Sequence, residues 1–146
     1  AGSTWTNTFT GNSNQLGKLF FLDDEIGYAC GLNGTIIKTI NGGDDWTILD
    51  SGTDALYLNA IHFMNADTGF VAGSDGTYLR TYNGGETWID KLKGYQGSLD
   101  DIFFLNSKIF TLLFLLPYFT PFLFHFPQQT GEGTDSPEAS SLPCVL

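Results

Sequence analysis

The sequence has few basic residues, and this scarcity limits its partners. Six Lys and Arg are outnumbered by sixteen Asp and Glu, Arg80 is the only arginine, and the formal net charge is −10. Proteins that bind nucleic acid need clustered Lys and Arg side chains to contact phosphates. We therefore expect no nucleic-acid partner, and we interpret the acidic residues as a solvated surface.

Cysteine and histidine are also scarce. Cys30 and Cys144 are the only cysteines and lie far apart, which excludes a disulfide framework and a four-cysteine metal site. We expect Cys30 to pack as a small hydrophobic residue. His62 and His125 are the only histidines, and no nucleotide-binding or nucleophile motif occurs. The sequence therefore predicts no metal, no cofactor and no catalytic residue.

The sequence does contain a repeat with a period of forty-two residues. Leu19 to Trp46 aligns with Ile61 to Trp88 without a gap. Aromatic residues and glycines keep their places in this alignment, as in the pairs Phe21–Phe63, Gly27–Gly69, Tyr28–Phe70, Gly31–Gly73 and Gly34–Gly76. Partial units precede and follow these two. A period of this length is typical of repeat architectures.

Each unit contains four short apolar runs separated by turn residues. In the first unit these runs cover about 19–22, 27–31, 35–39 and 46–49. Asn, Asp and Gly between the runs suit tight hairpins, and no helical period occurs before residue 108. Four antiparallel strands within about forty residues, repeated, are typical of a β-propeller blade.

We therefore predict an all-β fold of four-stranded β-propeller blades. Residues 1–107 form a partial propeller of about three blades, with complete repeats at about 19–60 and 61–102. Closed propellers have roughly four to eight blades, so these repeats cannot close a ring alone. We expect the chain to be a fragment of a longer propeller, or to self-associate through open blade edges.

One turn motif occurs twice, as TINGGDDW over 39–46 and as TYNGGETW over 81–88. Both copies resemble the Asp-box, also called the BNR repeat. The Asn side chain can bond to the backbone of its own turn, the glycines suit conformations that are costly with a Cβ, and the Trp can cover the hairpin. The resemblance implies a structural motif between the third and fourth strands, at the propeller rim. Its residues are Thr39, Asn41, Gly42, Gly43, Trp46, Thr81, Asn83, Gly84, Gly85 and Trp88.

The longer phrase GYACGLNGTIIKTINGGDDW, over 27–46, is similar to repeats of the photosystem II stability/assembly factor family. This resemblance covers about residues 1–107. It implies a non-catalytic propeller scaffold that mediates protein–protein interaction, either assembly factor-like or a related bacterial exported propeller. Secreted bacterial relatives favour a periplasmic, cell-surface or extracellular location. The candidate binding surface consists of tyrosines, although packing between blades also explains them: Tyr57, Tyr78, Tyr82 and Tyr95.

An alternative hypothesis is a fragment of an Asp-box propeller glycoside hydrolase. Such enzymes use a pair of carboxylates. The candidates are Asp23, Asp24, Glu25, Asp67, Asp100 and Asp101. We expect them to lie in turns or at strand ends, where they bond to the local backbone. Sialidases share the Asp-box but bind their substrate with three arginines, and this chain has Arg80 alone.

The chain after residue 107 does not follow the repeat. It contains all five prolines, and residues 109–126 form an apolar run without charge. One interpretation of 108–126 is a membrane segment, which would make the chain a membrane-tethered adhesion or receptor fragment. The other is a frame-shifted or fused segment. Residues 127–146 are polar, and we expect them to be disordered. We therefore predict a non-propeller C-terminal tail.

Overall fold

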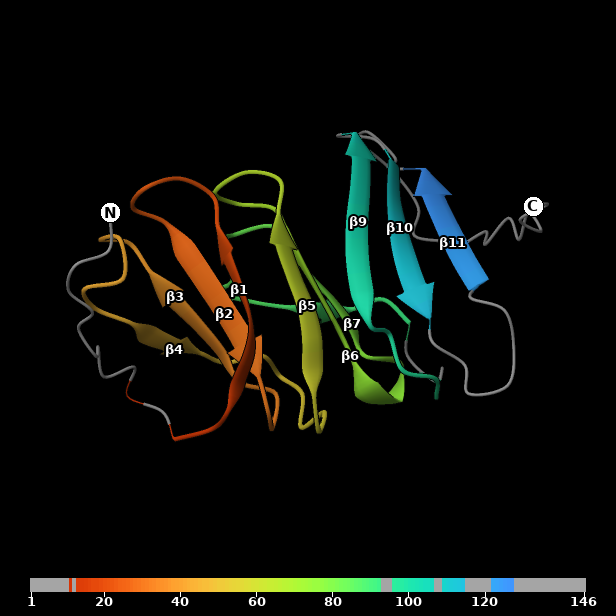
Figure 1. Cartoon of the computed structure of the whole chain (residues 1–146), viewed down its shortest axis with the longest axis horizontal. Coiled ribbons are helices and arrows are strands. Elements are labelled where there is room, and N and C mark those ends of the chain that lie inside the picture. The colour runs from red at the N-terminus through yellow and green to blue at the C-terminus, as the bar shows by residue number, and fades with distance from the viewer. Residues whose placement is uncertain (1–10, 12, 93–95, 107–108, 115–121, 128–146) are drawn as a thin grey trace, which may run out of the picture.

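The computed structural model describes residues 11, 13–92, 96–106, 109–114 and 122–127, and in these ranges it contains three antiparallel sheets (Figure 1). The first blade is a four-stranded sheet in sequence order: β1 (Leu16–Phe21), β2 (Gly27–Gly31), β3 (Ile36–Thr39) and β4 (Thr47–Leu49). The second blade repeats this order: β5 (Leu58–Phe63), β6 (Gly69–Gly73), the short 3-10 helix η1 (Ser74–Gly76), β7 (Tyr78–Thr81) and β8 (Ile89–Asp90). The predicted all-β fold of four-stranded propeller blades is confirmed.

The two blades share the register of their first hairpin. Phe21 pairs with Gly27 in the first blade, and Phe63 pairs with Gly69 in the second. The Phe ring lies across the glycine, because a Cβ on Gly27 would meet the Phe21 ring at 2.6 Å and a Cβ on Gly69 would overlap the Phe63 ring. The matched glycines of the repeat thus make room for the matched aromatic rings.

The first strand of each blade begins earlier than the sequence suggested. β1 starts at Leu16 rather than at about residue 19. Its pairing with β2 shifts between Leu16 and Lys18, and the β5–β6 pairing shifts at the corresponding place, between Leu58 and Ala60. Each shift is a β-bulge that leaves one extra residue in the strand. That residue is Gly17 in the first blade and Asn59 in the second.

The core lies between neighbouring sheets. Tyr28, Cys30 and Ile36 of the first blade pack against a buried set from the second blade: Leu58, Ile61, Phe63, Val71 and Leu79. The rings of Tyr28 and Phe63 stack at 3.7 Å between centroids, with an interplanar angle of 9°. Cys30 is fully buried in this cluster, which confirms its expected packing role. Burial also raises the pKa of its thiol to about 12.

A third sheet packs on the other side of the second blade (Figure 1). It consists of β9 (Asp101–Asn106), β10 (Ile109–Phe114) and β11 (Phe122–Pro127), in the order β11–β10–β9. Phe70 and Tyr78 of the second blade pack here against Leu99 and Ile102.

Strand pairing therefore continues past residue 107, where the repeat pattern of the sequence ends. The sequence analysis gave no strands in the apolar segment, and the structure adds β10 and β11 there. Six-residue runs rich in aromatic and apolar side chains suit a strand when a neighbour such as β9 offers backbone partners. No helix in the described ranges is both long and apolar enough to span a lipid bilayer. The rest of the predicted polar tail, beyond Pro127, lies outside the described residues.

One face of the first blade is not covered by any described strand. Leu19 is 60% exposed and Phe21 is 39% exposed, whereas their counterparts Ile61 and Phe63 in the second blade are 4% and 2% exposed. Beside Leu19 this face has a hollow of about 270 Å³, which reaches the Trp46 ring. Self-association through an open blade edge or face stays a prediction.

Candidate functional site

The first Asp-box turn joins β3 to β4 and holds itself together with side-chain hydrogen bonds. The Thr39 hydroxyl donates to Asn41 Oδ1 at 2.9 Å and accepts from the Gly43 backbone N–H at 2.9 Å. Asn41 Oδ1 also accepts from the Asp45 backbone N–H at 2.9 Å. Gly42 and Gly43 have φ values of 71° and 99°, a region that favours glycine. The Trp46 indole N–H donates to the Gly43 carbonyl at 3.1 Å.

The second Asp-box turn joins β7 to β8 with the same Thr and Asn bonds, whereas its buried Trp88 indole N–H has no hydrogen-bond partner among the described residues. Thr81 donates to Asn83 Oδ1 at 2.9 Å and accepts from the Gly85 N–H at 2.9 Å. Thr87, in the place of Asp45, donates its N–H to Asn83 Oδ1 at 3.0 Å. Gly84 and Gly85 again have positive φ values, of 66° and 89°. These bonds hold the polar side chains of the turn within the hairpin.

This second turn also joins the two blades. The Gly84 carbonyl accepts from the Lys38 ammonium at 3.1 Å and from the Tyr28 hydroxyl at 3.2 Å, and both donors belong to the first blade. The Trp88 ring lies edge-on to Phe63 at 6.1 Å between centroids. The turn therefore contributes to blade packing as well as to its own hairpin.

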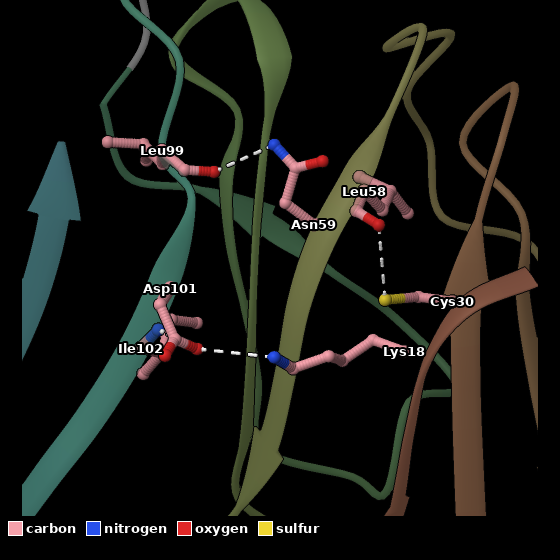
Figure 2. Close-up of polar contacts among 7 residues, drawn as sticks. All are labelled: Lys18, Cys30, Leu58, Asn59, Leu99, Asp101 and Ile102. Carbon is pink, nitrogen blue, oxygen red and sulfur yellow. Dashed lines mark hydrogen bonds and ion pairs between the residues drawn. The ribbon is translucent and has the colours of Figure 1, made fainter. Parts of the chain in front are cut away.

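The first strands of the three sheets, β1, β5 and β9, lie side by side (Figure 1). A ring ladder runs across them: His62 of β5 lies between Phe20 of β1, at 4.7 Å between centroids, and Phe104 of β9, at 4.5 Å. Near it, Lys18 Nζ reaches across β5 to Asp101 Oδ1 at 3.7 Å (Figure 2). Both charged side chains are about half exposed, so this ion pair contributes at most about 1 kcal/mol.

We expect His62 to make the fold sensitive to pH. Burial lowers its pKa below the ordinary value of 6.5, and the nearby Asp101 carboxylate opposes that shift. Because the unfolded chain takes up a proton more readily, this His adds stability above its unfolded pKa, and that stability is lost as pH falls toward the folded pKa. The counterpart of His62 in the first blade is Phe20, which does not titrate.

We predict that His62→Phe will remove part of the acid sensitivity of the fold. The variant should resist urea better than the wild type at about pH 5, and this advantage should shrink at about pH 8, where His62 is neutral in both states. Unfolding midpoints at the two pH values test this. Parallel pH profiles for the two proteins would contradict it.

The predicted binding tyrosines divide into exposed and buried ones. Tyr57 and Tyr82 are 49% and 51% exposed. Tyr78 is buried, so its assignment to an exposed surface is wrong. It occupies the place of the buried Ile36 in the repeat, and burial raises the pKa of its hydroxyl. Tyr95 lies outside the described residues.

The candidate carboxylates lie in turns and near strand ends. Asp23 Oδ1 accepts from the Ile26 N–H at 2.7 Å and from the Glu25 N–H at 2.9 Å, and these bonds hold the pKa of Asp23 below its usual value. Asn65 Oδ1 makes the same two bonds in the second blade. The side-chain amide of Asn65 thus takes the place of the Asp23 carboxylate in the equivalent turn.

The other candidate carboxylates differ in their surroundings. Asp24, Glu25 and Asp67 are exposed. Asp100 accepts from the Ser98 hydroxyl at 3.0 Å, and Asp101 accepts from the Ile102 N–H besides pairing with Lys18. Among the described residues, no group of three His, Cys, Asp or Glu side chains could hold a metal ion.

Sequence analysis did not identify the ladder or the Lys18–Asp101 pair. The signal was present, because the first two ladder residues, Phe20 and His62, are one period apart. The third ladder residue, Phe104, belongs to a unit whose alignment with the second unit is displaced by one residue. In that alignment Phe104 matches Phe63 and not His62.

Comparison with known proteins gives a match to one family and to several solved structures, two of which are described here. The family described as Photosynthesis system II assembly factor YCF48 matches residues 2–100. A structure described as YCF48 bound to D1 peptide is 20% identical, with a TM-score of 0.65, over 77% of this chain and 36% of that one. YCF48 from Cyanidioschyzon merolae is 17% identical, with a TM-score of 0.63, over 77% and 39%. No curated protein gives a significant match.

The chain thus spans less than two fifths of the length of either solved structure. At these identities the likeness shows the fold alone.

Proposed function

This chain belongs to the family of the photosynthesis system II assembly factor YCF48, and on that premise we propose that it is a non-catalytic propeller module that binds another protein. The observation that carries the proposal is the family match over residues 2–100, which includes both blades. A structure of one relative is described as bound to D1 peptide, so a D1 peptide is the first partner to test. This chain spans less than two fifths of that relative, and we propose the same class of partner for it.

Tyr57 is the side chain that we propose as the contact. Its backbone is fixed on both sides, since its N–H donates to the Ser74 hydroxyl at 3.1 Å and its carbonyl accepts from the Ser74 N–H at 2.8 Å. Its ring is nevertheless half exposed, just before β5. A rigid, exposed tyrosine offers contact area at a low cost in conformational entropy.

Tyr82 supplies the matched control. It is about as exposed as Tyr57, but it lies within the second Asp-box motif, where the Arg80 guanidinium lies over its ring at 4.3 Å from the centroid. The two tyrosines therefore have similar exposure and different places in the blade.

The test is a calorimetric titration of the whole chain with a synthetic D1 peptide. We expect saturable binding that Tyr57→Ala weakens by about tenfold, which corresponds to about 1.4 kcal/mol. Tyr82→Ala should bind as the wild type does. Absence of binding would reject the D1 peptide as partner, and equal weakening by both variants would reject Tyr57 as the contact.

A further inference from the structure

The two blades differ at their bulge residue, and the difference creates a gap. In the second blade the bulge residue is Asn59, whose side-chain amide donates to the Leu99 carbonyl at 3.0 Å (Figure 2). A second contact joins the same amide to the Ser98 hydroxyl at 3.4 Å. Asn59 thus bridges the second blade to the segment that leads into β9. In the first blade the same position is Gly17, which has no side chain to make this bridge.

The carbonyl that matches Leu99 in the neighbouring sheet is that of Leu58. It accepts a hydrogen bond from the Cys30 thiol at 3.5 Å instead of from an amide (Figure 2). A thiol is a weaker donor than an amide N–H. Burial raises the pKa of Cys30 to about 12, so the thiol keeps its proton at neutral pH. The Leu58 carbonyl thus has a weak donor where its counterpart has a strong one.

Space is present where the missing side chain would lie. A cavity of about 160 Å³ opens between the two blades, and we call it the Gly17 notch. Its lining includes Gly17, Gly31, Tyr57, Leu58 and Asn59. A Cβ added to Gly17 would meet no atom within 4 Å, and Gly17 itself is exposed. The notch is therefore open to a group that arrives from outside the chain.

We propose that the Gly17 notch receives a carboxamide side chain, Asn or Gln, from a protein partner, and that this amide donates to the Leu58 carbonyl. The assignment rests on the proposed protein-binding function. The molecule supplies the template itself, because Asn59 makes the same bond to Leu99 one blade later. A carboxylate in the notch would place its oxygens against the Leu58 carbonyl oxygen without a proton to share.

The inserted group would also lie beside Tyr57, the residue that we propose as the protein contact. One surface thus combines an exposed aromatic ring with a small cavity lined by Leu58, the residue whose carbonyl is the proposed acceptor. Sites of this kind, with a few placed polar groups in a concave and mostly apolar surround, give a ligand its orientation.

The test uses N-acetyl-L-asparagine N-methylamide as the probe and N-acetyl-L-aspartate N-methylamide as its control, so that only the probe has a primary carboxamide, and it is followed by NMR of the backbone amides. Ligands of this size bind weakly, so the readout is the change of chemical shift on titration. We expect saturable shifts at Gly17, Gly31 and Asn59 with the asparagine probe and smaller ones with the aspartate probe. Equal shifts with both probes would show that the notch does not select a carboxamide, and no shifts with either would show that neither probe enters it; both outcomes overturn the proposal.

Two variants make the test specific. Gly17→Asn places a carboxamide in the notch and should abolish the shifts without unfolding the chain, because no atom obstructs a Cβ there. Asn59→Gly should open a second notch and add shifts at Ser98 and Leu99. Retained binding in Gly17→Asn would overturn the proposal even if Asn59→Gly fails to fold.

The two proposals fail separately. The D1 titration reports on the protein partner, whereas the asparagine probe reports on the notch alone. If the peptide does not bind and the probe does, the notch stands and the partner is wrong. If the peptide binds equally well to Gly17→Asn and the probe gives no shifts, the protein-binding function stands and the notch is not part of it.

Discussion

Phe63→Ala is expected to destabilise the fold by about 3–5 kcal/mol, the usual cost of removing a buried aromatic ring. Phe63 is 2% exposed, stacks on Tyr28 at 3.7 Å and meets the edge of Trp88 at 6.1 Å. Its loss leaves a cavity at the centre of the interface between the blades, where rigid sheets on both sides limit collapse. Because small domains have about 5–15 kcal/mol of total stability, urea unfolding should show a large shift of the midpoint.

Phe21→Ala is the matched control for Phe63→Ala. Phe21 has the same place in the first blade, pairs with Gly27 as Phe63 pairs with Gly69, and meets Trp46 edge-on at 6.2 Å. It is 39% exposed, however, because no described strand covers it. We expect a loss of about 1 kcal/mol. Equal losses in the two variants would show that another part of the protein, or a second molecule, covers this face.

Gly73→Ala is the second substitution with a large expected effect. A Cβ on Gly73 would overlap the backbone carbonyl oxygen of Tyr57. That carbonyl also accepts from the Ser74 N–H at 2.8 Å, and the Gly73 carbonyl accepts from the Leu99 N–H at 2.9 Å. Relief of the overlap must therefore shift backbone that joins the second blade to the third sheet. We expect a loss of about 3 kcal/mol, measured by urea unfolding.

Gly17→Ala controls for the general effect of adding a methyl group to a strand glycine. No atom lies within 4 Å of its added Cβ, and its φ lies outside the left-handed region. We expect a change within about 0.5 kcal/mol. A Gly73→Ala variant as stable as Gly17→Ala would mean that the Tyr57 segment moves freely, in contradiction to the bonds that fix it.

The repeat made most of the strands predictable. Turn residues and apolar runs placed the two blades closely, because the same pattern occurred twice and each copy checked the other. Tyr78 shows the limit of residue type as evidence. Its tyrosine identity suggested a surface role, whereas its alignment with Ile36 predicts the core position that it occupies.

Other features could not be predicted because they depend on contacts between sheets. Lys18 and Asp101 occupy matching positions of their units, with Ala60 between them, but only the structure shows that the two side chains meet across β5. The Gly17 notch likewise depends on three segments that meet only in space. For β10 and β11 the sequence had no earlier copy to compare, and β9 supplies the pairing that makes them strands.

The strand order within each blade has a consequence for how the chain folds during synthesis. Every strand of a blade pairs only with strands next to it in sequence, and the whole first blade lies between residues 16 and 49. Closing such short loops costs little entropy and is fast. The first blade can therefore complete its backbone hydrogen bonds before β5 is synthesised, and it then offers Tyr28, Cys30 and Ile36 as a ready surface for the next. Translation order and spatial order coincide in this molecule.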